Sequence, residues 1–336
     1  MAQFVNFKKI ISFPPKMIKD EFKPVLMTFE ELMQHFENFS NELSNKREDT
    51  KGTYTRALRE FLRWFAVDKK FRFLVEDVQR YRDYLTHIKK LSPVSVSTYL
   101  TALRRFCEYL KLIGVIEKNP AKRIPGNKRP ASHSREFLTW EEIDQLLSSV
   151  ERKDEAGYRD YAMIKMMLGC AMSELELSNA DVGDLKVVND QYIIYVQGKG
   201  KDVKDEVVPV PDDVVKALHD YFTVRSKRQP VEPSQPMFVS LGPKNTGERL
   251  TNKGIRIIIN EYLKKSCVKK GRNRKLTPYS LKHTAAMIMV ENGATPEELK
   301  KRLRLGSIET AMIYFRQKGK LGKPPQKSDA IQLSLL

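Results

Sequence analysis

The chain has 336 residues, of which 41% are hydrophobic and 30% are charged, a balance typical of globular domains and not of disordered or membrane chains. No apolar run approaches the roughly 20 residues needed to cross a bilayer, and the segment from Met1 to Asp20 lacks the apolar core of an export signal. We therefore expect a cytoplasmic protein with no membrane partner, long enough for two domains.

Charge is the first informative feature of the composition. The chain holds 60 Lys and Arg against 42 Asp and Glu, a formal net charge of +18, which predicts a polyanionic partner. The basic residues are spread over many helical segments and form no single amphipathic helix, which favours nucleic acid over a membrane surface. A basic ribosome-associated protein, or one that is merely soluble, is the alternative.

The three cysteines, Cys107, Cys170 and Cys267, indicate no metal site. They are odd in number, far apart in sequence and lack the spacing of metal ligands. We expect reduced, structural thiols, and neither a metal ion nor an organic cofactor.

In chain order, residues 1–25 read as an N-terminal arm, because their prolines interrupt any periodic pattern. Thr28 and Glu31 then form a capping box that predicts a helix through Phe36 and Phe39. A second helix is expected from about Gly52 to Phe65, with an apolar stripe on one side and arginines on the other.

A third helix is expected over Val75–Ile88, and Ser92 and Pro93 predict the start of a fourth that Gly114 ends. Four helices with short links predict a helical bundle over residues 26–121. Residues 122–136 are rich in proline, glycine, serine and basic side chains, so we expect a linker there.

The second domain is predicted to span residues 137–317 and to begin helical, with a capping box at Thr139 and a long apolar helix over 159–172. The period then changes to two: residues 191–196 and 206–210 predict two strands of a hairpin. Later segments return to helix, including one that starts at Thr295. The predicted fold class is mainly α with a small antiparallel β-sheet.

Four stretches of the second domain, in order, resemble the tyrosine recombinases, the family of phage integrases and Xer-type enzymes. Residues 169–175 (GCAMSEL) are similar to the family's G-L-R-x-S-E-L, and residues 198–210 to its G-K-G-x-K-x-R-x-V-P-L. Residues 276–284 (LTPYSLKHT) resemble L-T-P-H-x-L-R-H-T, and residues 305–314 (LGSIETAMIY) resemble L-G-H-x-x-I-x-T-T-x-x-Y. The N-terminal bundle, ending in Asn119-Pro120-Ala121, is similar to the family's SAM-like core-binding domain, and the second domain to its mixed α/β catalytic domain.

The resemblance implies a chemistry for two positions. In the family a tyrosine attacks a DNA phosphodiester, giving a 3′-phosphotyrosyl link and a free 5′ hydroxyl, and Tyr314 has the nucleophile's place. A lysine on the hairpin turn protonates the leaving 5′ oxygen, and Lys199 fits that role. Two arginines hold the non-bridging oxygens of the phosphate, a task suited to planar, permanently charged side chains.

Several family positions are replaced here. The first arginine is Ala171 and the second is Lys282, which we expect to face bound phosphate together with His283. The family's histidine before the second arginine is Tyr279, which can donate a hydrogen bond but is a weak base near neutral pH. Its later His or Trp is either Leu305, read without a gap, or lost in a two-residue deletion after Gly306.

The resemblance also implies a C-shaped clamp with one domain on each side of a DNA duplex. Basic side chains of both domains are predicted to contact backbone phosphates, which position a protein without specifying sequence. They are Arg56, Arg59, Arg63, Arg104 and Arg105 of the first domain, and Lys201, Lys264, Lys265, Lys269, Lys270, Arg272, Arg274 and Lys275 of the second. Residues 318–336 form a tail whose apolar end is predicted to dock on a neighbouring protomer.

The leading hypothesis is thus a nucleoid-associated protein of the tyrosine-recombinase family that binds double-stranded DNA and acts in recombination or integration. Its own cleavage would be weak or absent, and it would self-associate on DNA, from dimer to tetramer, or assist an active recombinase. The rival is an active site-specific recombinase in which Lys282 and Arg302 or Arg304 rebuild the phosphate clamp. A basic structural protein or transcription factor is the third class.

Overall fold

A computed structural model describes residues 22–43, 48–68, 71–127, 136–198, 203–269 and 276–322, with only the backbone described at 48–50. The chain divides into two compact units, Met1–Pro130 and Ala131–Leu336. The boundary between them falls inside the stretch for which the sequence predicts a linker. Among the described residues, no helix has the length and apolarity that a bilayer crossing requires.

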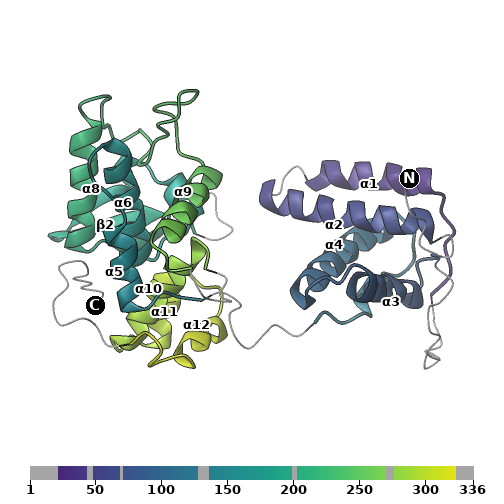
Figure 1. The fold of residues 1–336 in the computed structure, drawn as a ribbon. Helices are drawn as coiled ribbons and strands as arrows, with labels where there is room; N and C mark the ends of the chain where they lie inside the picture. The colour runs from purple at the N-terminus through teal and green to yellow at the C-terminus, as the bar shows by residue number, and fades with distance from the viewer. Residues whose placement is uncertain are drawn as a thin grey trace. The chain divides into compact units, whose positions relative to one another are not determined.

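The first unit is a bundle of helices, in which α1 and α2 run side by side (Figure 1). Thr28 begins α1 with the predicted capping box: its hydroxyl accepts from the amide of Glu31, whose carboxylate accepts from the Thr28 amide. The elements are α1 (Phe29–Glu42), α2 (Glu48–Val67), α3 (Val75–Asp83), the π-helical turn η2 (Tyr84–Ile88), α4 (Pro93–Leu112) and the 3₁₀ turn η3 (Pro120–Lys122).

Aromatic rings fill the core of this unit. Phe61 of α2 is fully buried, and the rings of Phe71 and Tyr81 meet it edge-on with centroids 5.3 and 5.2 Å away. Such edge-to-face pairs add to the free energy gained by burying apolar surface. The opposite side of α2 is basic, because Arg56, Arg59 and Arg63 are exposed.

The second unit is built around two helices that are buried along most of their length, α6 and α10. Side chains from Ser280 to Val290 of α10 are all buried, and α6 packs against both α8 and α10. The helices are α5 (Trp140–Ser148), α6 (Glu155–Gly169), α7 (Glu174–Asn179), α8 (Asp212–Arg225), α9 (Asn252–Lys265), α10 (Tyr279–Glu291), α11 (Pro296–Leu303) and α12 (Ile308–Phe315), with a 3₁₀ turn η4 (Val182–Asp184).

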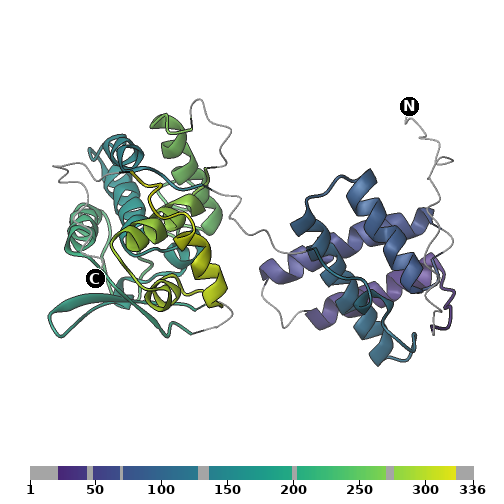
Figure 2. The ribbon, with the colours of Figure 1, turned by 90° about the horizontal axis from the view of Figure 1, so that it is seen from below.

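A three-stranded antiparallel sheet lies at the rim of the second unit (Figure 2). Its strands are β1 (Leu185–Val188), β2 (Gln191–Val196) and β3 (Glu206–Pro209), in the order β1-β2-β3. The β2–β3 register pairs Val196 with Glu206 and Ile193 with Pro209. The predicted class, mainly α with a small antiparallel sheet, is confirmed. The sequence prediction missed β1, and the predicted third helix ends in η2 instead of continuing as regular α-helix.

Candidate active site

Three of the predicted site residues, Tyr279, Lys282 and His283, lie close together in the first turns of α10. Tyr279 and His283 are four residues apart and so share a face of the helix. Their rings meet nearly edge-on, with centroids 5.0 Å apart and planes at 73°. Lys282 and His283 are only 6% and 4% exposed, so a charged and a polar side chain are buried in the core of the unit. Buried groups of this kind are retained only where partners satisfy them.

Tyr314 reaches the same place from α12. Its hydroxyl lies 2.6 Å from Nδ1 of His283, and the tyrosine is 4% exposed. Burial, with Tyr279 nearby, raises the pKa of Tyr314 above its usual range. The phenol is therefore neutral at physiological pH. It contacts the imidazole of His283, the residue that follows Lys282.

Lys282 is neutralised by an acidic residue for which the sequence reasoning assigned no role. Its Nζ lies 3.0 Å from Oε2 of Glu176, near the start of α7. Burial lowers the pKa of Lys282 to about 8, although Glu176 opposes that shift. For Glu176 burial acts in the raising direction, but Lys282 and Arg304 outweigh it and hold the pKa at about 2. The carboxylate is thus ionised, and the lysine is mostly protonated at neutral pH.

Arg304 is the second cation on the same carboxylate. Its Nε donates to Oε1 of Glu176 at 2.5 Å and its Nη2 to Oε2 at 3.0 Å, a two-pronged contact that fits planar guanidinium to carboxylate. The same Nη2 lies 2.7 Å from the carbonyl oxygen of Ala171. The guanidinium therefore lies against the residue that stands in the place of the family's first arginine.

The backbone at both ends of that contact is left-handed. Ala171 has φ +49 and Arg304 has φ +56, a region that favours glycine. Arg304 is the C-cap of α11, where glycine is the usual residue. The motif quoted above has glycine at this point when it is read without a gap, so the backbone favours the ungapped reading, with Leu305 in place of the family's His or Trp.

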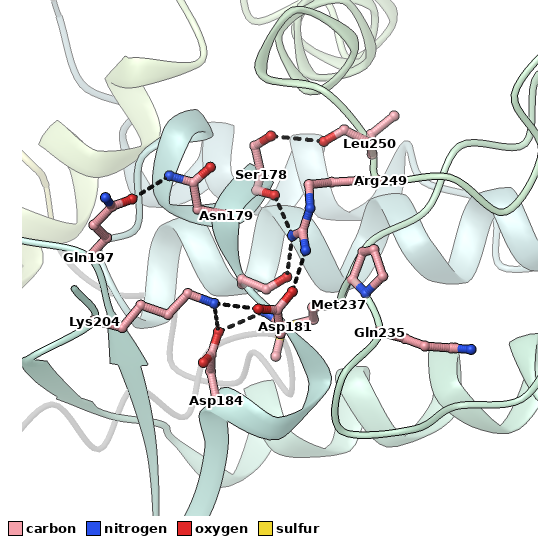
Figure 3. A network of polar contacts seen from close by, with 12 residues as sticks. Ser178, Asn179, Asp181, Asp184, Gln197, Lys204, Gln235, Met237, Arg249 and Leu250 are labelled. Carbon is pink, nitrogen blue, oxygen red and sulfur yellow. Dashed lines mark hydrogen bonds and ion pairs between the residues drawn. The ribbon is translucent and has the colours of Figure 1, made fainter. Parts of the chain in front are cut away.

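The far end of α7 contacts the residues that flank the turn of the β2–β3 hairpin (Figure 3). Asn179 donates to the side-chain oxygen of Gln197 at 2.7 Å. Lys204, on the other arm of the hairpin, lies 2.7 Å from Asp181 and 2.5 Å from Asp184. One six-residue helix thus has Glu176 near its start and, at its end, the asparagine that contacts the hairpin.

Arg249, far away in the sequence, also belongs to this polar network. Its guanidinium donates to the carbonyl oxygens of Ser178 and Ala180 at 3.0 and 3.1 Å and pairs with Asp181. Burial acts to raise the pKa of Asp181, but hydrogen bonds from Arg249 and Lys204 outweigh it and lower the pKa. Asp181 therefore receives two cations at one position, as Glu176 does.

The hairpin turn itself, residues 199–202, lies outside the described residues, and so do Lys199 and Lys201. The same holds for Lys270, Arg272, Arg274 and Lys275. Their assignments stay predictions.

Of the other predicted phosphate contacts, Arg105, Lys264 and Lys265 have exposed side chains, and Lys269 is half-buried with its amine 3.0 Å from Asn260. Arg104 differs from them, because its guanidinium donates to the carbonyl oxygens of Ala121 and Ile124. It links α4 to the segment around η3, and because these carbonyls already accept from its guanidinium, its contact with phosphate stays a prediction.

Sequence reasoning overlooked Glu176 and left Arg304 as one of two candidates. A signal for Glu176 existed: Ser173-x-x-Glu176 is a capping-box pattern, and the Ser173 amide donates to Glu176 at 2.6 Å. The structure separates the arginine candidates, because Arg302 donates to the carbonyl oxygen of Pro209 and not to Glu176.

Both units of the chain match models of known protein families. Residues 136–320 match the phage integrase family, and residues 31–127 match the phage integrase SAM-like domain. The tyrosine recombinase XerC of Pelotomaculum thermopropionicum is 28% identical over 289 residues, covering 82% of this chain and 92% of its own length. The tyrosine recombinase XerD of Staphylococcus epidermidis is 26% identical over 289 residues, covering 84% and 92%.

Solved structures show the same fold. The XerH site-specific recombinase bound to palindromic difH substrate has a TM-score of 0.69 at 18% identity, covering 87% of this chain and 82% of its own. A lambda integrase dimer bound to a COC′ core site has a TM-score of 0.63 at 13% identity, covering 90% and 99%. With a family match over more than half of its length, this chain belongs to the phage integrase family.

Proposed function

We propose that this chain binds double-stranded DNA and acts in DNA recombination or integration, and that its own strand cleavage is weak or absent. Family membership supports the first part, because the relatives are named tyrosine recombinases and two solved relatives are described bound to their DNA sites. The formal net charge of +18 supports a polyanionic partner. In this proposal the protein is cytoplasmic and associated with the nucleoid.

The observation that carries the second part is the sharing of Glu176. Lys282 stands at the family's second arginine position and Arg304 lies beside the first, and the same carboxylate neutralises both. Their donors are engaged by Glu176 and by main-chain carbonyls, so they are not preorganised for the charge that develops on a phosphate during attack.

The rate factors expected for the missing groups agree with weak or absent strand cleavage. Loss of one preorganised donor typically lowers a rate by about 10² to 10³, and an arginine that stabilises phosphoryl transfer can be worth roughly 10³ to 10⁵. Here Ala171 removes one arginine and Lys282 replaces the other with a side chain that lacks the planar fork. We propose that Tyr314, His283, Tyr279 and the hairpin lysine Lys199 keep their family places in a pocket that binds phosphate poorly.

In the same proposal the exposed arginines of α2 and the lysines at the end of α9 contact the DNA backbone. Self-association on DNA, from dimer to tetramer, and assistance to an active recombinase belong to it as well. The exposed side chains of Arg56, Arg59 and Arg63 support the α2 assignment, since all three lie on the side of the helix away from the core.

A second candidate function, an active site-specific recombinase, is favoured by one observation. Arg304 places a guanidinium 2.7 Å from the Ala171 carbonyl, so a fork of the right chemistry lies near the vacant arginine position. In that case Arg304 and Lys282 together hold the phosphate that Tyr314 attacks.

The experiment begins with fragmented genomic DNA of the source organism, from which the protein recovers its own sites. Nicked duplexes carrying those sites are then incubated with the protein, and a denaturation-resistant adduct is measured. The variants are Tyr314→Phe and the exchange Ala171→Arg with Arg304→Gly, which returns the guanidinium to the family's position. We expect little or no adduct from the unaltered protein and at least a hundredfold more from the exchange variant.

An adduct from the unaltered protein that matches the exchange variant and vanishes in Tyr314→Phe would establish the active enzyme. If no site is recovered, and any DNA affinity that is measured does not change with salt concentration, the proposal that the chain binds DNA is wrong.

A further inference from the structure

The carboxylate of Glu176 has the surroundings of a bound anion and not those of a surface ion pair. It is about 10% exposed, and its two oxygens accept from Lys282, from two nitrogens of Arg304 and from the Ser173 amide. Side chains of Lys282 and Arg304 are 7% and 4% exposed. Removing three ionic groups from water is unfavourable unless their geometry compensates, so the arrangement holds a negative charge at one defined point.

The donors around that point match a phosphate as well as a carboxylate. A guanidinium fork binds two oxygens of either anion, and a lysine supplies a further charge-assisted hydrogen bond. The point also lies beside Ala171, whose carbonyl contacts the same guanidinium, and beside α10, which carries His283 and its partner Tyr314.

We propose that Arg304 is the relocated phosphate-binding arginine of this pocket, and that Glu176 occupies the phosphate position between Arg304 and Lys282 until a DNA phosphate displaces it. The inference rests on the proposed function in one respect, namely that the incoming anion is a DNA phosphate. It goes further in assigning Arg304 to the clamp and in naming Glu176 as the group that keeps the clamp occupied.

A hollow in the second unit borders this position on the side of Arg304. The hollow, of about 490 Å³, is lined by residues of α11, α12 and the segment between them, and by one residue of β3: Glu206, Glu297, Lys300, Lys301, Arg304, Leu305, Gly306 and Ile308. Three cations and two carboxylates line it, so the excess of positive charge is small, and Gly306 has nothing within 4 Å of where a side chain would start. Of the three groups of the proposed clamp, Arg304 is the one that lines this hollow.

The test uses inorganic phosphate as the probe, so that it does not depend on a DNA site. Glu176→Gln removes the competing charge and retains an amide oxygen for the Ser173 amide. We expect this variant to bind orthophosphate at least about tenfold more tightly than the unaltered protein, measured by titration calorimetry and by the phosphate-induced rise in Tm. Its crystal structure in phosphate should show the anion between Lys282 and Arg304.

Matched variants separate this site from the many surface cations. Adding Arg304→Gln to Glu176→Gln should remove the gain, whereas adding Arg302→Gln should keep it, because Arg302 donates to the Pro209 carbonyl. Equal phosphate affinity with and without Glu176→Gln, or a gain that survives Arg304→Gln, would overturn the proposal. Should the single variant melt below the assay temperature, Glu176→Ala is titrated at a lower temperature in its place, and a phosphate affinity equal to that of the unaltered protein overturns the proposal.

The DNA experiment distinguishes the two proposals. If Glu176→Gln binds phosphate between Lys282 and Arg304 but no DNA is bound by any variant, the anion site stands and the proposed function fails. If DNA is bound and phosphate affinity is insensitive to Glu176, the proposed function stands and this inference fails.

Discussion

The hydroxyl of Tyr314 on α12 lies 2.6 Å from Nδ1 of His283 on α10, and both side chains are buried. The contact joins Tyr314 to the residue that follows Lys282, so the proposed nucleophile on α12 and the proposed phosphate clamp are both tied to the first turns of α10. A short connection of this kind limits how far Tyr314 can move without disturbing Glu176 and Arg304.

Replacing Tyr314 with Phe should remove that hydrogen bond while retaining the ring. We expect a loss of about 1 kcal/mol in the free energy of unfolding, because a buried polar group loses one neutral partner. Urea denaturation followed by circular dichroism measures it. DNA binding should be unchanged in the same variant, so a large loss of affinity would mean that the hydroxyl contributes to the interface.

Acid should expose the contribution of Glu176 to stability. Its pKa is about 2 in the folded chain against an ordinary value of 4.5, so the unfolded chain binds more protons between these values. The stabilisation is complete above pH 4.5 and is lost as the pH falls towards 2, on the order of 3 kcal/mol in total. Urea unfolding at a series of pH values should show a steeper acid decline for the unaltered protein than for Glu176→Gln, and parallel curves would contradict the assignment.

Asp181 offers a test of whether the polar network beside the hairpin turn holds the hairpin in place. Asp181→Asn weakens the ion pairs with Arg249 and Lys204 but leaves Lys204 with Asp184. We expect faster amide exchange along the β2–β3 ladder, measured by hydrogen–deuterium exchange, with α10 unaffected. Asp190→Asn, on the exposed turn between β1 and β2, is the matched control. Equal protection in both variants would show that the network does not hold the hairpin.

Salt dependence of DNA affinity should report the phosphate contacts of α2. Each phosphate contact that is removed lowers the slope of log affinity against log salt by about 0.9. Arg56→Gln and Arg59→Gln should each reduce the slope by nearly that amount. Arg80→Gln is the control, because Arg80 of the same unit pairs with Asp68 and Asp77. An equal effect of all three variants would point to net charge alone and not to a contact face.

Local signals in the sequence account for most of the fold. Capping boxes at Thr28, Thr139 and Thr295 predicted three helix starts that the structure shows. Strand β1 was missed because it follows a 3₁₀ turn and most of its side chains are exposed, so it lacks the alternation that identified β2. Its pairing depends on a tight turn in which Asn189 and Asp190 both have positive φ.

The candidate site was predictable only where the motif carried it. Tyr279, Lys282, His283 and Tyr314 were predicted because their spacing resembles the family pattern, and the structure brings them together. Glu176 could not be placed by spacing, since it lies 106 residues from Lys282 and 128 from Arg304 along the chain. Contacts over such separations depend on how α7, α10 and α11 pack, which no local pattern specifies.

The guanidinium of Arg304 beside Ala171 has a consequence for how such sequences can change. Restoring arginine at position 171 alone would put a third buried cation near one carboxylate, so that reversal should be harmful until Arg304 or Lys282 also changes. Losing Arg304 first would leave the pocket without any guanidinium at the clamp. Substitutions at 171, 176 and 304 are therefore expected to depend on the order in which they occur, and descendants of this chain should exchange them together or keep all three.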